Sequence, residues 1–174
     1  MSTASVPVLR TPRLTLRPLT EADLAALAAL LRAPGVREWW GPPVPDERPE
    51  LANDGAAFAI DCDGELAGWL AFSEEDDPVY RHAGLDIVLA PAFQGRGLGP
   101  EALRAAIGWP GRRGHHRITI DPAADNARAI RAYEAAGFRP VGVLRQYERG
   151  PDGQWRDGLL MELLVAEAAG GPGP

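Results

Sequence analysis

Hydrophobic and polar residues alternate in several short stretches of the N-terminal half, a pattern that predicts half-buried β-strands. The first such stretch is 14–17, and Thr20 after it is a typical N-cap for an Ala- and Leu-rich helix that ends near Leu31. The apolar stretches 58–62 and 66–72 flank Asp63-Gly64, which is a strong signal for a two-residue hairpin turn. We therefore expect a strand and a helix, followed by two antiparallel strands.

The C-terminal half is predicted to contain both strands and helices. The strands are expected at 84–89, 116–120, 141–148 and 159–164, and the helices at 101–107 and 126–136. Gly108 and Pro110 should end the first helix and Gly137 the second, while four prolines between Gly41 and Pro49 predict a loop. These elements predict an α/β (mixed α+β) fold in which helices flank a mixed sheet.

The length of 174 residues suits one domain, which we place at 1–168. The Gly- and Pro-rich segment 169–174 is expected to be a disordered tail. Cys62 is the single cysteine and no signal-like segment starts the chain, so we expect a cytoplasmic protein in which Cys62 fills the core. The apolar run 24–31 is far shorter than the roughly 20 residues that span a bilayer, so no membrane partner is expected.

The charge of the chain argues against some partners and suits others. A net charge of −6 disfavours a nucleic-acid partner and suits a cationic small molecule, although mild acidity also serves solubility alone. All 18 basic residues are arginine, which excludes a lysine nucleophile and the lysine of a P-loop. His82, His115 and His116 show no metal-ligand spacing, so we predict no metal.

A glycine-rich stretch, Gln94-Gly95-Arg96-Gly97-Leu98-Gly99, joins a predicted strand to a predicted helix. Glycines can turn consecutive backbone N–H groups toward an anion, and the start of the next helix adds further unpaired N–H groups. The glycines are spaced by two, which differs from the Gly-x-Gly-x-x-Gly pattern of dinucleotide-binding loops. The stretch is typical of a diphosphate-binding loop, and an ordinary tight turn is the alternative.

This loop resembles the acyl-CoA loop of the GNAT superfamily of N-acetyltransferases, whose pattern is Gln/Arg-x-x-Gly-x-Gly/Ala. Gln94, Gly97 and Gly99 occupy the specified positions, and the block 121–138 resembles the later CoA-side helix and turn of the same superfamily. The resemblance implies an acetyl-CoA-dependent enzyme. It also implies a GNAT fold with a central, mostly antiparallel sheet of about six to seven strands, splayed into a V and flanked by helices.

The same resemblance places the cofactor. The V would open between the strand that ends at Leu89 and the strand that begins near Arg117, where pantetheine pairs with the strand backbone. The segment 108–114 departs from typical members, because the helix after the loop is short. The cofactor-binding residues implied are Ile87, Val88, Leu89, Gln94, Gly95, Arg96, Gly97, Leu98, Gly99 and Asn126.

Tyr133 is the predicted general acid. It follows Asn126 by two helical turns, so both residues should face one side of the helix. In the superfamily the matching tyrosine protonates the CoA sulfur, which completes direct transfer without a covalent enzyme intermediate. A tyrosine that only packs in the core is the alternative.

Two aspartates indicate which class of acceptor molecule the enzyme binds. The blocks around Glu38-Trp39-Trp40-Gly41, Asp86 and Asp121 resemble those of aminoglycoside 6′-N-acetyltransferases, in which the matching aspartates hold amino groups of the antibiotic. We therefore predict that Asp86 and Asp121 bind the substrate, and that Asp86 also assists deprotonation of the attacking amine, directly or through water. The alternatives are a salt bridge from Asp86 to Arg81 or His82, and an Asp-Pro turn at Asp121.

Two further residues are predicted substrate contacts. Trp40 suits stacking on a sugar ring, and Asp77, in the acidic stretch 74–77, suits a distal ammonium group. The alternatives are that Trp40 closes the core and that the acidic stretch is simply solvated.

The resulting hypothesis is an N-acetyltransferase that acts on a primary amine of an aminoglycoside or similar polycationic small molecule, with antibiotic resistance as the associated role. A protein N-terminal acetyltransferase, of the kind that modifies ribosomal proteins, is the second interpretation. A non-catalytic acyl-CoA-binding module is the third, because a fold does not fix an activity. By analogy with the superfamily, the protein would be a monomer or a homodimer.

Overall fold

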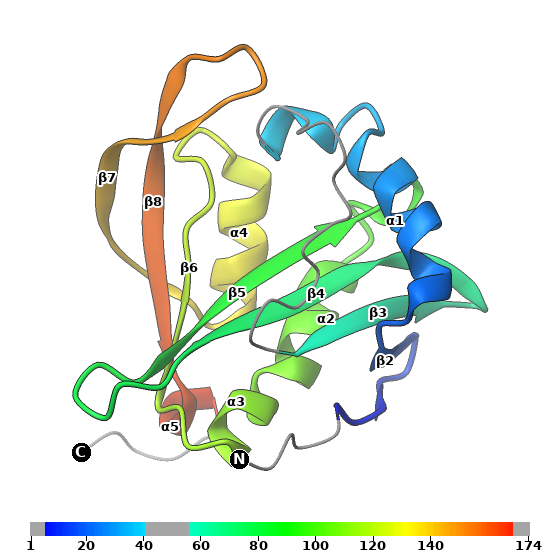
Figure 1. The fold of residues 1–174 in the computed structure, drawn as a ribbon, viewed down its shortest axis with the longest axis horizontal. Coiled ribbons are helices and arrows are strands. Elements are labelled where there is room, and N and C mark those ends of the chain that lie inside the picture. Colours follow the sequence, from blue (N-terminus) through cyan, green and yellow to red (C-terminus); the bar gives the residue numbers. More distant parts are fainter. Residues whose placement is uncertain (1–5, 41–55, 169–174) are drawn as a thin grey trace.

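The computed structural model describes residues 6–40 and 56–168. The predicted Pro-rich loop 41–49 and the predicted tail 169–174 lie outside the described residues. Among the described residues, eight strands form one sheet in the order β1-β2-β3-β4-β5-β6-β8-β7 (Figure 1). All neighbouring strands are antiparallel except β5 and β6, which confirms the predicted mixed sheet.

The first half of the chain forms the antiparallel part of the sheet. Asp63 and Gly64 have φ values of 52° and 82°, so they make the predicted hairpin turn with the left-handed geometry that suits the twist of the strands. The elements are β1 (Leu9–Arg10), β2 (Leu14–Pro18), a 3-10 turn (Glu21–Asp23), α1 (Leu24–Leu31), a 3-10 turn (Arg37–Trp39), β3 (Ala57–Cys62), β4 (Glu65–Glu75) and β5 (His82–Leu89).

The second half adds the helices that cover one face and the strands that complete the sheet. Asn126 caps its helix through Oδ1, which accepts a hydrogen bond from the Ala129 N–H at 3.1 Å, and Gly137 ends that helix at φ 105°. The elements are a 3-10 turn (Pro91–Phe93), α2 (Leu98–Ala106), α3 (Gly108–Arg112), β6 (Arg117–Ile120), α4 (Ala127–Ala136), β7 (Arg139–Arg149), β8 (Trp155–Leu164) and α5 (Val165–Ala168).

The helices after the glycine-rich loop differ from the prediction. α2 begins at Leu98 rather than Glu101, and α3 follows it where we expected the chain to leave helical structure. Pro100 and Pro110 each lie at the third position of their helix. The first-turn N–H groups have no partner within a helix, so a proline there removes no hydrogen bond.

The sheet has apolar side chains on both faces. In β4, Leu70 and Phe72 pack with α2 and α4, whereas Trp69 and Ala71 pack with α1 on the other side. This two-sided burial explains why β4 reads as a continuous apolar run instead of an alternating one. Cys62 is also buried in this core as a free thiol, as predicted.

The splayed pair β5 and β6 positions the site. The two strands pair in parallel only at Ala83 with Ile118 and at Gly84 with Thr119. Beyond these pairs β5 continues to Leu89 along β4 while β6 turns away, and α4 stands behind the opening (Figure 1). The edge of β5 that faces the opening therefore has backbone groups available to a ligand.

Candidate active site

A cavity of about 560 Å³ lies where β5 separates from β6. Its wall combines the end of β5, the glycine-rich loop and one side of α4, so segments distant in the sequence meet around one space. The predicted residues that line it are Trp40, Asp86, Ile87, Val88, Leu89, Gln94, Gly95, Gly97, Gly99, Asp121, Asn126 and Tyr133.

The glycine-rich loop has the geometry expected of an anion site. Gly95 and Gly97 have φ values of 71° and 75°, which favour glycine. Gly97 is the N-cap of α2, and none of the described side chains caps that helix end. Gln94 closes the turn, because its Nε2 donates a hydrogen bond to the Leu89 carbonyl at 2.8 Å. The N–H groups at the start of α2 are therefore free to bind an anion.

Two predicted loop residues do not line the cavity. The Leu98 side chain is fully buried in the core, and the Arg96 guanidinium lies over the Phe93 ring at 5.6 Å. The Arg96 carbonyl accepts a hydrogen bond from Arg13 at 2.9 Å. At Leu98 a ligand contact would therefore have to come from the backbone N–H, whereas the exposed Arg96 side chain lies outside the cavity wall.

Tyr133 and Asn126 face the same cavity from α4, as the helical spacing predicts. Tyr133 is only 9% exposed, and its ring packs against the edge of Phe138 with the ring centroids 6.2 Å apart. Burial, with the negative charges of Asp86 and Asp121, raises the pKa of the Tyr133 phenol well above its usual range. Tyr133 is therefore protonated at neutral pH and has a proton to donate.

Asp86 lies in the cavity without an ion-pair partner among the described residues. Arg81 pairs instead with Asp76 at 3.1 Å, and His82 Nδ1 contacts the Tyr80 carbonyl, so the alternative of a salt bridge at Asp86 is wrong. Water reaches Asp86 from the cavity while protein surrounds its other sides. This partial desolvation, followed by the charge of Asp121, raises the pKa of Asp86 to about 6.

Several charged residues of the cavity were missed by the sequence reasoning. Glu148 on β7 adds a third carboxylate to Asp86 and Asp121, and Arg128 and Arg131 on α4 add positive charge to the wall. Glu148 follows an irregularity in β7 that the local sequence pattern does not predict. The two arginines belong to the recognised block 121–138, and their helical spacing of three was the available signal.

Trp40 lies in the wall of the cavity, whereas Asp77, the other predicted substrate contact, does not. Trp40 lines the cavity, is 36% exposed, and meets the edge of Trp69 with the ring centroids 5.6 Å apart. Asp77 lies in the connection between β4 and β5, at the end of β5 opposite Leu89 (Figure 1), and is not part of the cavity wall. Its Oδ1 accepts a hydrogen bond from the Val79 N–H at 2.8 Å, so it stabilises its own turn.

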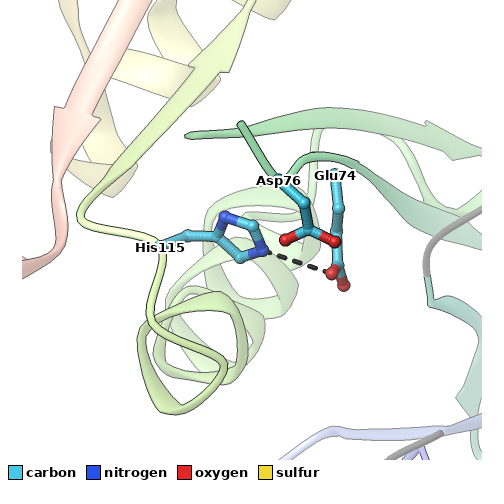
Figure 2. Close-up of side chains that lie close together, drawn as sticks. All are labelled: Glu74, Asp76 and His115. Atoms are coloured by element: carbon cyan, nitrogen blue, oxygen red, sulfur yellow. Dashed lines mark ion pairs between the residues drawn. The ribbon is translucent and has the colours of Figure 1, made fainter. Parts of the chain in front are cut away.

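A second polar cluster lies at the start of β6, away from the cavity. Figure 2 shows Glu74, Asp76 and His115, whose potential ligand atoms lie within 4.8 Å of one another. Arg113 donates to both Glu74 carboxylate oxygens, at 2.6 and 2.7 Å, and the His115 Nε2 lies 3.2 Å from Glu74. A metal ion would have to displace this guanidinium, so the contacts describe an ion-pair network. Glu74 is therefore buried, and the interpretation that the whole acidic stretch 74–77 is solvated does not hold for this residue.

The substitution Glu74→Gln is expected to destabilise the fold. The Glu74 side chain is 2% exposed, and removing its charge leaves Arg113 and His115 with a weaker acceptor. Burial opposes ionisation of Glu74, but the hydrogen bonds from Arg113 and the adjacent His115 outweigh it and lower its pKa. We expect a loss of about 1–3 kcal/mol in the free energy of unfolding at pH 7, measured by urea denaturation.

The pH dependence follows from the lowered pKa. The ionised Glu74 contributes to the free energy of unfolding above its unfolded pKa, and this contribution is lost as the pH falls through the folded pKa. The difference in unfolding free energy between wild type and Glu74→Gln should therefore shrink in acid. Glu75→Gln, which changes an exposed neighbour, is the matched control. Equal stability of Glu74→Gln and wild type at pH 7 would contradict the role of the network.

Comparison with known proteins gives the family. A GNAT acetyltransferase domain matches residues 13–139. The chain is 34% identical over 167 residues to the aminoglycoside N(6′)-acetyltransferase type 1 of Klebsiella pneumoniae, covering 80% of this chain and 78% of that protein. It is 28% identical over 156 residues to the spermidine N(1)-acetyltransferase of Escherichia coli, with coverages of 84% and 83%.

A solved structure agrees with these relatives. The spermidine N-acetyltransferase from Vibrio cholerae in complex with CoA and spermine has a TM-score of 0.79 and 25% identity, and the match covers 91% of this chain and 99% of that one. The chain belongs to the GNAT acetyltransferase family. It is an acetyl-CoA-dependent N-acetyltransferase. Within residues 6–40 and 56–168, no helix combines the length and apolar character needed to cross a membrane.

Proposed function

We propose that this enzyme acetylates a primary amine of a polycationic small molecule, either an aminoglycoside or a similar polyamine. The observation that carries the proposal is the grouping of Asp86, Asp121 and Glu148 in one cavity with Tyr133. Several carboxylates at separate points can bind several ammonium groups and orient one of them for reaction. The relatives named for aminoglycoside and spermidine acetylation support this substrate class.

The proposed mechanism has two proton transfers, one from the attacking ammonium group and one to the leaving sulfur. Acetyl-CoA supplies the acetyl group as a thioester. Asp86, ionised above about pH 6, accepts the proton that the attacking ammonium must lose, directly or through water. Tyr133 donates its phenolic proton to the sulfur that leaves, and the raised pKa of the phenol keeps that proton in place until then.

The cofactor would lie along the opening of the sheet. The backbone edge of β5 from Ile87 to Leu89 has no β6 partner and suits the amide groups of pantetheine. Gly95, Gly97 and the N-terminus of α2 suit the diphosphate. Asn126 uses its Oδ1 as a helix cap, so its Nδ2 group is the part available to the cofactor.

The geometry favours a small polyamine over a protein N-terminus. A peptide acceptor calls for a narrow channel with strand edges that pair with its backbone, whereas a wide cavity with several carboxylates suits a compact polycation. The three carboxylates of this cavity lie on β5, after β6 and on β7, so they surround the acceptor space from separate elements.

The direct test compares acceptors by the release of free CoA thiol from acetyl-CoA. We expect kanamycin-type sugars or spermidine to be used with a kcat/KM at least about tenfold above that of short peptides, because only the polycations engage more than one carboxylate. Raising the ionic strength should reduce this preference, since exposed charge pairs are screened. Thiol release with peptides alone would refute the proposed substrate class.

A further inference from the structure

The strand β7 is irregular where it passes the cavity. Leu144 pairs with Gly158 and Glu148 pairs with Arg156, so β7 advances four residues while β8 advances two. Gln146, inside the extra segment, has a φ of 49°, in the left-handed region that favours glycine. Bulges of this kind bend a strand and redirect its side chains, and strained backbone is retained where the surrounding structure supports it.

Contacts from β8 hold this bulge in one conformation. The Gln146 N–H donates to Asp157 Oδ1 at 2.8 Å. The Tyr147 ring crosses the backbone at Gly158, where a Cβ atom would lie 2.8 Å from the ring. Glycine at 158 therefore allows the Tyr147 ring to approach the β8 backbone, and both contacts hold the bulge against β8.

The bulge brings Tyr147 onto one of the cavity aspartates. The Tyr147 hydroxyl donates a hydrogen bond to Asp121 Oδ2 at 2.6 Å. This bond, burial and the charge of Asp121 raise the pKa of Tyr147 to about 12, so the hydroxyl remains a donor at neutral pH. The contact fixes the Asp121 carboxylate while leaving its second oxygen for a ligand.

The next residue, Glu148, lines the cavity as a half-buried carboxylate. Burial raises its pKa; the nearby Arg156 opposes this, and the charges of Asp121 and Asp125 add to it. The Arg156 NH1 group donates instead to the Glu38 carbonyl at 2.7 Å, and no ion pair to Glu148 is found within the described parts of the chain. Glu148 is thus a cavity carboxylate without an ion-pair partner in the described parts of the chain.

We propose that the β7 bulge builds a second ammonium subsite, in which Glu148 and Asp121 bind an amino group of the acceptor other than the one that is acetylated. Glu148 is then a specificity-determining residue, and Tyr147 is a positioning residue that acts through Asp121. Asp86 remains the partner of the reacting amine. This inference rests on the proposed function and adds the residues that select a polyvalent acceptor.

The test of Glu148 is steady-state kinetics of Glu148→Gln with spermidine. We expect the KM for spermidine to rise about tenfold with kcat and the acetyl-CoA KM within about twofold, because a charge contact to a distal group contributes to binding and not to chemistry. Glu134→Gln, the same change on the outer side of α4, should behave as wild type.

The outcomes separate this inference from the proposed function. An unchanged spermidine KM in Glu148→Gln, or a fall in kcat as large as the rise in KM, overturns the subsite while leaving polyamine acetylation intact. A wild-type enzyme that acetylates no polycationic amine overturns both.

The positioning role of Tyr147 is tested by a double-mutant cycle. Tyr147→Phe should raise the spermidine KM by about threefold or more in the wild-type background, and should add almost nothing when Asp121→Asn is already present. A purely structural role would instead lower the thermal midpoint and add to the effect of Asp121→Asn. Additive effects on KM would overturn the assignment of Tyr147.

Discussion

Tyr133→Phe is expected to lower kcat by on the order of 100-fold or more while the Kd for acetyl-CoA stays within about twofold, since a positioned acid contributes this much to a proton transfer. The substitution removes one hydroxyl and keeps the ring that packs against Phe138. None of the described residues hydrogen-bonds this hydroxyl, so its loss leaves no buried protein partner unsatisfied. Steady-state kinetics and calorimetry with acetyl-CoA separate the two quantities.

The matched control for this prediction is Tyr80→Phe. Tyr80 is 73% exposed in the connection between β4 and β5, so the same chemical change there should leave kcat unaltered. The pH profile of kcat gives a second check. A phenol with a raised pKa serves as an acid throughout the neutral range, so the loss of kcat in Tyr133→Phe should be the same across that range. Normal turnover in Tyr133→Phe would remove this residue from the proposed mechanism.

Asp86→Asn is expected to lower kcat/KM for a polycationic acceptor by on the order of 100-fold, because both the anion that binds the ammonium and the group that accepts its proton are lost. Acetyl-CoA affinity should be nearly unchanged. The variant should be at least as stable as wild type at pH 7.5, since the raised pKa shows that the fold disfavours the Asp86 charge. Asp63→Asn, at the β3–β4 turn, is the control.

The pH profile distinguishes a functional Asp86 from a structural one. The wild-type kcat/KM should fall as the pH drops through about 6, where Asp86 becomes protonated, and Asp86→Asn should lack this limb. Asp121→Asn should move the limb to lower pH, because the negative charge of Asp121 contributes to the raised pKa. Equal losses of acetyl-CoA affinity and acceptor use in Asp86→Asn would indicate a structural residue.

Local signals predicted most elements of the fold. Asn126 and Gly137 mark the two ends of α4 by side-chain capping and by left-handed backbone, and Asp63-Gly64 marks the hairpin; all three depend on neighbours in the sequence. The start of α2 was predicted too late because glycine and proline were read as loop residues. In the first turn of a helix neither residue sacrifices a hydrogen bond.

The sequence alone was enough to predict the family, the glycine-rich loop and the placement of Tyr133 and Asp86 on elements that border the opening between β5 and β6. These features depend on residue type and on spacing within one strand, turn or helix. Only the fold shows that Glu148 lines the cavity, that Tyr147 contacts Asp121, that Asp77 lies away from the cavity and that Glu74 is buried in an ion pair. Those outcomes depend on strand register and on which elements meet in space. For Glu148 and Tyr147, the pairing of β7 with β8 sets the register through contacts that no local pattern contains.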